Sequence, residues 1–365
     1  MLWRYNHTLP RMRGFLICYT RGSRIGVESR TLWTLADAAK DSHLYGIPRR
    51  ITLTAGGGLA KLYGLLLSDT KVHNRETLLS LVKSRPPGTP LVTVSNHVST
   101  LDDPLMWGIR GLPLADSKLC RWALAAEDIC FTNAFFSYFF RLGKCIPVTR
   151  GAGIYQPHMA EALERLNDGD WLNTFPEGKI SQEGGPLRRL KWGTGSLIAR
   201  AKVSPIVLPI GHSGFEKMIP EQWWRGKRPP IPLWNKKVDI FIGEPIQFDI
   251  PTLKQNAFKW ARTSAGVGSS DCGSNNADDR KRPSFGSTGY DPHPLPFGAR
   301  RSSAFLQTAE TLDTMRTDGI HAPLLDGPIL DEAAWRWMYT DITEHIWVAL
   351  SDVTEKARTL NQSRA

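Results

Sequence analysis

Short apolar runs alternate with amphipathic segments through the central part of the chain. The runs predict buried strands at 91–95 (LVTVS), 145–148 (CIPV), 171–175 (WLNTF), 206–211 (IVLPIG) and 238–243 (VDIFIG). Helical spacing of apolar residues predicts helices at 72–85, 102–110, 133–143, 154–169 and 192–202. This alternation predicts an α/β fold with a mostly parallel central sheet flanked by helices. In such sheets chemistry gathers in the loops that follow the strands.

Two helices carry details that a structure can test. Asn74 is the expected N-cap of the helix that ends before the turn PPGTP. The segment NAFFSYFFRLG (133–143) reads as a buried aromatic helix, capped by Asn133 and ended by Gly143.

Composition divides the chain into four parts. We expect a basic N-terminal extension at 1–50 and the main domain at 51–260. A low-complexity insertion is expected at 261–330, because its Gly, Ser, Asn, Asp and Pro cannot bury enough apolar surface to fold. Residues 331–365 predict a C-terminal helix that completes the domain, with an apolar side at four-residue spacing formed by Ala334, Met338, Ile342, Ile346 and Leu350.

Two segments near the N-terminus admit more than one reading. The first 30 residues hold six arginines, no lysine and the single acid Glu28, which suits either an organelle transit segment or a disordered basic tail. The segment ITLTAGGGLAKLYGLLL (51–67) is too short and too polar for a confident membrane span. It either lies in a membrane interface or forms a buried amphipathic helix.

The overall charge indicates an anionic partner. The net charge is +11, which suits nucleic acid, a phospholipid surface or a phosphorylated substrate. The 13 tryptophans favour a membrane interface, where one edge of the ring is apolar and the other is wet. The five cysteines contain no CxxC pair, so we expect neither a zinc site nor a disulfide framework.

One loop, residues 221–237, combines aromatic and basic residues. Aromatic rings at headgroup depth with cations for anionic lipid make it a candidate interfacial loop. A solvated basic loop whose aromatic rings pack inward is the alternative. A nucleic-acid groove uses similar residues, but no nucleic-acid motif accompanies them, so we expect no such partner. The candidate interfacial residues are Trp223, Trp224, Arg225, Lys227, Arg228 and Trp234.

The first candidate for chemistry is SNHVSTLDDP (95–104), directly after a predicted strand. Asp102 can accept from one ring nitrogen of His97 and leave the other nitrogen to take a proton from a hydroxyl. Alternatively, Ser99 and Asp102 form a capping box at a helix start, and the histidine is incidental. The pair works only if His97 lies in the loop and Asp102 in the first helical turn.

The second candidate is FPEGKIS (175–181), also at the end of a predicted strand. A carboxylate beside Pro and Gly, followed by Lys179, can hold a hydroxyl and a phosphate together. In isolation, a proline-glycine turn with incidental charges explains the segment equally well. A P-loop is excluded, because the pattern G-x-x-x-x-G-K-[ST] does not occur.

Together, NHxxxxDP and the later FPEG resemble the glycerolipid acyltransferase family. The resemblance covers roughly residues 61–250 and is closest to its branch of mitochondrial phospholipid–lysophospholipid transacylases. It rests on an ordered set of segments: VHNRE (72–76), TPLVTVSNH (89–97), DDPLMWGI (102–109), RW (121–122), DICFT (128–132), LGKCIPV (142–148), LNDGDW (166–171), FPEGK (175–179), KWG (191–193) and PIVLP (205–209).

The resemblance implies a role for each residue that matches the family pattern. His97 would be the general base and Asp102 its orienting partner. Glu177 and Gly178 would help bind the glycerol-phosphate part of a lysophospholipid, and Lys179, named above for a phosphate, is a further candidate substrate-binding residue. Arg150 stands where the wider family keeps a phosphate-binding arginine. Lys179 and Ile180 replace the family's usual Thr and Arg, which suits the branch that acts on whole phospholipids.

The resemblance also implies the reaction and its setting. The expected activity is CoA-independent acyl transfer between membrane phospholipids and lysophospholipids, with cardiolipin as a remodelled lipid and no cofactor or metal. The expected location is mitochondrial membranes, facing the intermembrane space. An acyl-CoA-dependent lysophospholipid acyltransferase and a non-enzymatic membrane-binding protein remain the alternatives.

Overall fold

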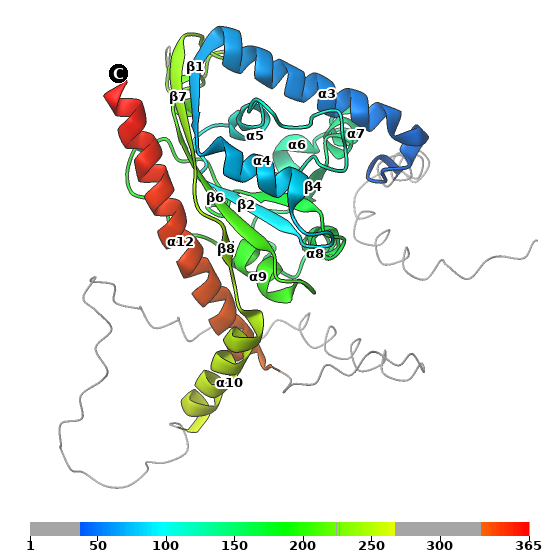
Figure 1. Cartoon of the computed structure of the whole chain (residues 1–365), viewed down its shortest axis with the longest axis vertical. Helices are drawn as coiled ribbons and strands as arrows, with labels where there is room; N and C mark the ends of the chain where they lie inside the picture. Colours follow the sequence, from blue (N-terminus) through cyan, green and yellow to red (C-terminus); the bar gives the residue numbers. More distant parts are fainter. Residues whose placement is uncertain (1–36, 224, 226, 267–329, 365) are drawn as a thin grey trace, which may run out of the picture.

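An eight-stranded sheet lies at the centre of the molecule (Figure 1). The computed structural model describes residues 37–223, 225, 227–266 and 330–364. Within them the strand order is β1-β7-β6-β2-β5-β3-β4, with β8 beside β6. Strand β6 pairs antiparallel with β7 and β8, and all other neighbouring strands pair in parallel, so the predicted mostly parallel sheet is confirmed. The strands are β1 (Ser68–His73), β2 (Leu91–Ser95), β3 (Trp122–Ala126), β4 (Cys145–Val148), β5 (Trp171–Thr174), β6 (Ile206–Ser213), β7 (Lys236–Ile242) and β8 (Ile246–Gln247).

Helices cover both faces of the sheet. Helices α8, α9 and α12 share one hydrophobic core with one face, and α4 and α5 share a second core with the other. Helix α3 lies across α5 and α7 (Figure 1). The helical segments are η1 (His43–Gly46), α3 (Ile47–Leu62), η2 (Tyr63–Leu67), α4 (Arg75–Ser84), α5 (Asp102–Met106), α6 (Glu127–Cys130), α7 (Ala134–Leu142), α8 (Pro157–Asn167), α9 (Trp192–Arg200), η3 (Phe215–Lys217), α10 (Ile250–Gly266) and α12 (Glu332–Ser363).

The continuous apolar character of the central strands follows from this sandwich. In β2, Val92 and Val94 belong to the core beneath α8, α9 and α12, whereas Leu91 belongs to the core beneath α4 and α5. Successive side chains of a strand point to opposite faces, so a strand covered on both faces is apolar at nearly every position. This is why these strands stood out in the sequence.

Three strands were not foreseen. Residues 68–73 form β1 and pair in parallel with β7, although the predicted helix included residues 72 and 73. Its sequence, SDTKVH, is mostly polar because it lies at the sheet edge. Asn74 does not cap α4 through its side chain; its φ of 56° is left-handed and its amide donates to Ile242 O at 3.1 Å. The other unforeseen strands are β3, the alanine-rich WALAA, and the two-residue β8.

The aromatic helix α7 is exposed, so the expectation of a buried helix was wrong. Asn133 does cap it, accepting from Phe136 N at 3.0 Å, as expected. Phe135, however, is 73% exposed, and Phe136 and Phe139 are exposed as well. The aromatic period predicts the helix, but among the described residues no element covers this side of it.

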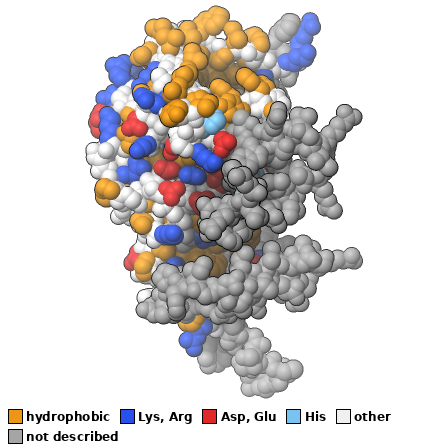
Figure 2. Space-filling view, turned by 90° about the vertical axis from the view of Figure 1, so that its right-hand side faces the viewer, with side chains coloured by type: hydrophobic (Ala, Val, Ile, Leu, Met, Phe, Trp, Pro, Cys, Tyr) orange, Lys and Arg blue, Asp and Glu red, His pale blue; other side chains and the backbone are white. Residues whose placement is uncertain are grey.

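The segment 51–67 is also not a buried amphipathic helix. It forms most of α3 and all of the π-helical turn η2, whose Leu65, Leu66 and Leu67 are exposed. Hydrophobic side chains gather at the end of the molecule where α3 lies (Figure 2). No helix in the described ranges is both long and apolar enough to cross a membrane.

The N-terminal part of α3 is fixed to the body of the protein by a buried arginine. The guanidinium of Arg49 donates to Asp41 and to Ala38 O, and it stacks 5.2 Å from the ring centre of Trp122. Further along, a Cβ added at Gly108 would lie 2.7 Å from Ala60 O, so the backbones of α3 and of the segment after α5 touch directly. Only glycine permits this approach.

The expected domain boundaries shift slightly. Helix α3 starts at Ile47, before the expected limit of 51, and α10 continues to Gly266, past the expected limit of 260. Helix α12 packs on β6, β7 and α9, where the C-terminal helix was expected to complete the domain. The remaining insertion, 267–329, and residues 1–36 lie outside the described residues.

Buried Asp239 ties α12 to the edge of the sheet. Its carboxylate accepts from His73 Nε2 at 2.9 Å, Arg364 at 2.6 Å and Asn361 Nδ2 at 3.2 Å. These partners come from β1 and the last turn of α12, regions far apart in the sequence. A buried carboxylate with this set of donors joins them.

We predict that Asp239→Ala lowers the free energy of unfolding by about 3–5 kcal/mol, because it leaves buried donors and a cation without their partner. Urea unfolding followed by circular dichroism measures this. The control is Asp352→Ala, which removes an exposed i,i+4 pair with Lys356 on the same helix. It should cost less than about 0.5 kcal/mol. Equal losses of unfolding free energy in the two variants would show that Asp239 does not join α12 to the sheet edge as described.

Candidate active site

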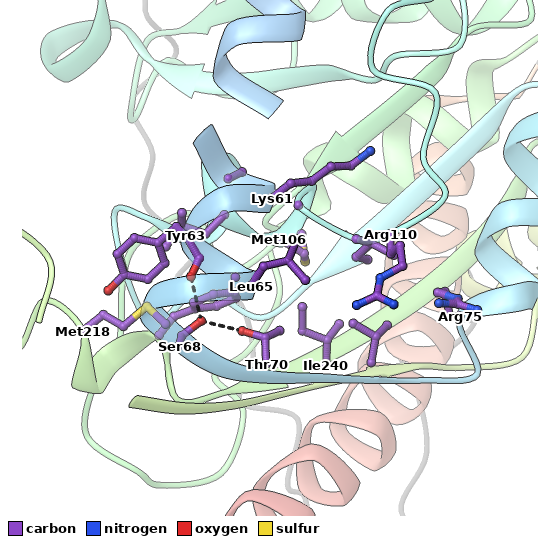
Figure 3. Close-up of a pocket in the computed structure, with 17 residues that line it drawn as sticks. Lys61, Tyr63, Leu65, Ser68, Thr70, Arg75, Met106, Arg110, Met218 and Ile240 are labelled. Atoms are coloured by element: carbon purple, nitrogen blue, oxygen red, sulfur yellow. Dashed lines mark hydrogen bonds between the residues drawn. The ribbon is translucent and has the colours of Figure 1, made fainter. Parts of the chain in front are cut away.

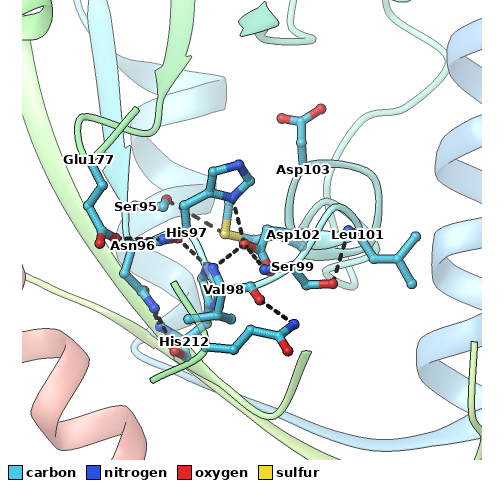
Figure 4. Close-up of polar contacts among 12 residues, drawn as sticks. Ser95, Asn96, His97, Val98, Ser99, Leu101, Asp102, Asp103, Glu177 and His212 are labelled. Carbon is cyan, nitrogen blue, oxygen red and sulfur yellow. Dashed lines mark hydrogen bonds and ion pairs between the residues drawn. The ribbon is translucent and has the colours of Figure 1, made fainter. Parts of the chain in front are cut away.

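The loop after β2 brings His97 and Asp102 together. His97 lies in the loop, and Asp102 is the first residue of α5, the arrangement that the pair requires. His97 Nδ1 lies 2.8 Å from Asp102 Oδ2 (Figure 4). Asp102 is completely buried, whereas the His97 side chain is 21% exposed. The imidazole therefore has one nitrogen held inside and one edge toward solvent.

A single oxygen of Asp102 both holds the histidine and closes the turn that leads into α5. Oδ2 also accepts from Val98 N at 2.7 Å and Ser99 N at 2.8 Å. The bond from Ser99 N is one half of the predicted capping box. The other half is absent, because Ser99 Oγ accepts from Leu101 N instead. The two readings of SNHVSTLDDP are thus compatible.

These contacts define which imidazole nitrogen is basic. A carboxylate only accepts, so we assign the ring proton to Nδ1, which leaves the lone pair on Nε2. Phe175 stacks on the ring, with centres 4.4 Å apart and planes inclined by 23°. Carboxylate and phenyl ring together fix the direction of the imidazole. The arrangement can take a proton at Nε2 and return it.

The FPEG loop supports His97 from the other side. Glu177 Oε1 accepts from His97 N at 2.8 Å, and Ser181 N donates to His97 O at 2.8 Å. Glu177 is buried and does not line the pocket, so its carboxylate is turned away from the position expected for binding a lysophospholipid. Burial raises the pKa of Glu177, while the hydrogen bond from His97 N opposes that rise.

Gly178 and Lys179, in contrast, do line the pocket. Gly178 has a left-handed φ of 67°, and a Cβ there would meet the Lys191 side chain at 2.6 Å. The left-handed backbone therefore favours glycine here, whereas the end of the flexible Lys191 side chain can move aside. Lys191 N donates to Pro176 O at 2.8 Å, which fixes the turn against the start of α9.

The pocket beside His97 has a volume of about 880 Å³ and is open to solvent. Its walls combine apolar side chains with cations, a composition suited to a lipid with a phosphate. The apolar part includes Leu124, Ile129, Val148, Ile154 and Trp192, and the basic part consists of Arg150, Lys179, Arg189, Lys191 and Arg228. No cluster of three His, Cys, Asp or Glu that could hold a metal occurs in the described part of the chain.

Arg150 lies on the pocket wall, as its expected role requires, but it is already paired. It forms an exposed ion pair with Asp128, which raises the pKa of Arg150 and lowers that of Asp128. A phosphate in the pocket would compete with the carboxylate of Asp128 for Arg150. Solvent-exposed ion pairs of this kind contribute little energy.

Of the candidate residues in the expected interfacial loop (221–237), Arg228 lines this pocket. Arg228 also pairs with Glu221 at 2.8 Å. Trp223 is 51% exposed and Trp234 is 64% exposed, so neither ring is packed inward. Arg225 and Lys227 are exposed too. Trp224 lies outside the described residues.

Sequence reasoning missed a second histidine that supports the loop. Buried His212 of β6 donates its backbone N–H to Asn96 Oδ1 at 2.9 Å, and Asn96 Nδ2 donates to His212 O at 3.0 Å. His212 Nε2 lies 2.8 Å from Asn96 O. Burial lowers the pKa of His212. No local sequence signal predicts a pairing across 116 residues.

Comparisons with known proteins agree with this site. The family model described as Acyltransferase matches residues 69–213, which include both loops. An N-acylphosphatidylethanolamine synthase of Arabidopsis thaliana is 59% identical over 221 residues, covering 60% of this chain and 78% of the relative. The chain belongs to the glycerolipid acyltransferase family. It is an acyltransferase, and the resemblance carried by NHVSTLDDP and FPEGK is confirmed.

Two further proteins resemble this acyltransferase. Tafazzin of Drosophila melanogaster is 38% identical over 218 residues, covering 60% of this chain and 56% of the fly protein, so the match spans just over half of that relative. A crystal structure of the 1-acyl-sn-glycerophosphate acyltransferase PlsC from Thermotoga maritima superposes with a TM-score of 0.41 at 19% identity, covering 67% of this chain and 99% of that one.

We predict that Asp102→Asn keeps the fold but lowers kcat by about 10²–10⁴-fold. The asparagine oxygen still accepts from Val98 N and Ser99 N, but the charge that stabilises protonated His97 is lost. Steady-state acyl transfer and thermal unfolding measure the two effects. Ser99→Ala is the control, since it removes the Leu101 N contact and leaves the His97 contact intact. Full activity of Asp102→Asn would show that Asp102 has only a structural role in the turn into α5.

We predict that Glu177→Gln is at least as stable as the native protein at pH 7. The amide oxygen keeps the bond from His97 N, while the cost of burying a charge disappears. Because burial raises the pKa of Glu177 in the folded state, native stability falls, relative to the variant, as pH rises above about 4.3. Urea titrations from pH 4 to 8 test the trend; the opposite slope would show that the ionised carboxylate stabilises the fold.

Proposed function

We propose that the protein transfers an acyl group from a membrane phospholipid to a lysophospholipid, with His97 as the general base. His97 Nε2 takes the proton of the acceptor hydroxyl as that oxygen attacks the ester carbonyl of the donor. The tetrahedral intermediate then expels the donor's glycerol oxygen, which receives the proton back from His97. Asp102 holds the ring and stabilises its protonated form. One ester forms, one breaks, and no proton is consumed.

One observation carries the proposal: His97 is held by a buried carboxylate on the wall of a pocket with apolar and cationic sides. The apolar wall suits acyl chains, and the cations suit a lipid phosphate. Lys179 and Arg150 are the residues assigned to the phosphate. Glu177 acts indirectly, by fixing the backbone of His97.

The proposed donor and acceptor come from the tafazzin relatives. A phospholipid donor makes the reaction CoA-independent, and no cofactor takes part. Cardiolipin is the proposed lipid to be remodelled, and mitochondrial membranes facing the intermembrane space are the proposed location. The similarity to the fly tafazzin supports these assignments.

A second candidate function is N-acylation of phosphatidylethanolamine. It is favoured by the relative named N-acylphosphatidylethanolamine synthase, at 59% identity. The same histidine serves, because an attacking amine must also lose a proton as it becomes an amide. The two functions differ in the bond that forms: an ester with a lysophospholipid, or an amide with the ethanolamine nitrogen.

Both functions require contact with a bilayer, and one exposed surface offers it. Tyr63 OH donates to Leu233 O at 2.7 Å, and Asn235 N donates to Leu67 O at 2.7 Å. The loop that carries Trp234 is thus joined to the exposed leucines of η2. Apolar side chains flanked by Trp and basic residues are suited to the interfacial region of a membrane. We call this the η2–Trp234 surface.

We predict that purified full-length protein moves a labelled acyl chain from phosphatidylcholine to monolysocardiolipin without CoA. Vesicles contain labelled phosphatidylcholine with either monolysocardiolipin or phosphatidylethanolamine as acceptor. Products are separated before and after mild alkaline treatment, which cleaves esters and spares amides. An alkali-stable product would favour the second candidate function.

Two controls complete the assay. Acyl-CoA replaces the phospholipid donor in a parallel reaction; transfer only from acyl-CoA would overturn the proposed donor. His97→Gln should lose about 10²–10⁴-fold in rate while still binding vesicles. Full activity of His97→Gln would show that His97 is not the base. If the native protein transferred no acyl group from either donor, a purely membrane-binding role would be supported instead.

A further inference from the structure

A second pocket lies behind the helix that carries Asp102. Its volume is about 320 Å³, and it is enclosed by η2, β1, α5 and the segment from Phe215 to Met218 (Figure 3). Helix α5 contributes Leu105 and Met106 to its wall, whereas Asp102 of the same helix serves His97. None of the residues that line it lines the pocket beside His97.

The lining of this second pocket is apolar inside and basic at one end. Its apolar wall is formed by side chains from several elements, among them Leu65 of η2, Val72 of β1, Met106 of α5, Phe215 of η3 and Ile240 of β7. Arg75 and Arg110 lie together at one end, and Tyr63 and Met218 at the other (Figure 3). Lys61 also contributes to the lining, and no Asp or Glu does so.

The charge of Arg110 is not compensated within the described part of the chain. Arg110 is exposed and has neither an ion pair nor a side-chain hydrogen bond there, and Arg75 pairs only with its neighbour Glu76, which is itself exposed. Two guanidinium groups at the end of an apolar trough match a phosphate that continues into a hydrocarbon chain.

The position of the second pocket indicates where its occupant comes from. Leu65 lines it and is also 60% exposed on η2. Met218, at the other end, accepts through its carbonyl from Leu233 N at 2.9 Å, in the loop that carries Trp234. The pocket therefore borders the η2–Trp234 surface, with Leu65 common to both. A volume at the lower end of the range for ligand sites holds one chain rather than a diacyl lipid.

We infer that this pocket binds an acyl chain of an anionic phospholipid, with the lipid phosphate on Arg75 and Arg110. The site is separate from the acyl-transfer site, and its occupant is a bound lipid rather than a substrate. Because α3, η2 and α5 all contribute to the walls, the bound lipid stabilises the crossing of α3 with the helix of Asp102. Binding to the folded state alone raises its stability.

The test uses dodecyl phosphate that carries a photoreactive diazirine in its chain. This probe has no acyl ester and no hydroxyl, so it is neither donor nor acceptor at His97. Full-length protein is irradiated with increasing probe, digested and analysed by mass spectrometry. We expect saturable labelling within residues 60–70 or 105–110. Unlabelled dodecyl phosphate should compete, whereas inorganic phosphate alone and dodecyl maltoside should compete at least about tenfold less well.

Matched variants localise the site. Arg110→Gln should weaken labelling at 60–70 by about tenfold, and Thr70→Phe, which fills the trough, should abolish it. Arg189→Gln, on the wall of the His97 pocket, should leave it unchanged. Thermal unfolding confirms that each variant is folded. Three results would overturn the inference. Labelling could be confined to the walls of the His97 pocket, dodecyl maltoside or inorganic phosphate could compete fully, or labelling could be insensitive to both Arg110→Gln and Thr70→Phe.

Discussion

The acyl-transfer site depends on one oxygen atom. Oδ2 of buried Asp102 accepts from His97 Nδ1, Val98 N and Ser99 N. A carboxylate removed from water is costly unless donors surround it, so the turn from β2 into α5 must wrap around this oxygen. Once that turn has formed, the histidine ring has one orientation. The carboxylate that closes the turn into α5 is thus also the one that holds His97, the proposed base.

The surrounding elements hold the turn in place from two sides. Glu177 and Ser181, at the FPEG loop, form hydrogen bonds with the backbone N–H and carbonyl of His97. On the other side, Asn96 and His212 exchange hydrogen bonds and join the turn to β6. His97, the proposed base, is therefore positioned by contacts to its own turn from the FPEG loop and from β6.

The sequence predicted what is encoded locally. Strands covered on both faces were found because they are apolar at almost every position, and Asn133 was found as a cap because capping needs only its own helix. Strand β1 was missed because an edge strand such as SDTKVH has no comparable pattern. The same limit explains α7, whose period reveals a helix but not which neighbour covers it.

The site shows the same division. Motif spacing identified His97, Asp102 and the FPEG loop, but residue type alone does not tell where a carboxylate points. Glu177 was expected in the pocket and instead holds the histidine backbone. The His212 contact and the Arg75–Arg110 pair arise only when segments distant in the sequence meet in the fold.

The contact between Gly108 and Ala60 O has a consequence for how the enzyme would choose its substrates. Since no side chain separates the two backbones, the distance between α3 and the segment that follows α5 is fixed by direct backbone contact. If the exposed leucines of η2 enter a bilayer, as the proposed function requires, this contact sets the height of His97 relative to the lipid surface. The depth of an ester carbonyl in the bilayer would then help to decide which lipids react.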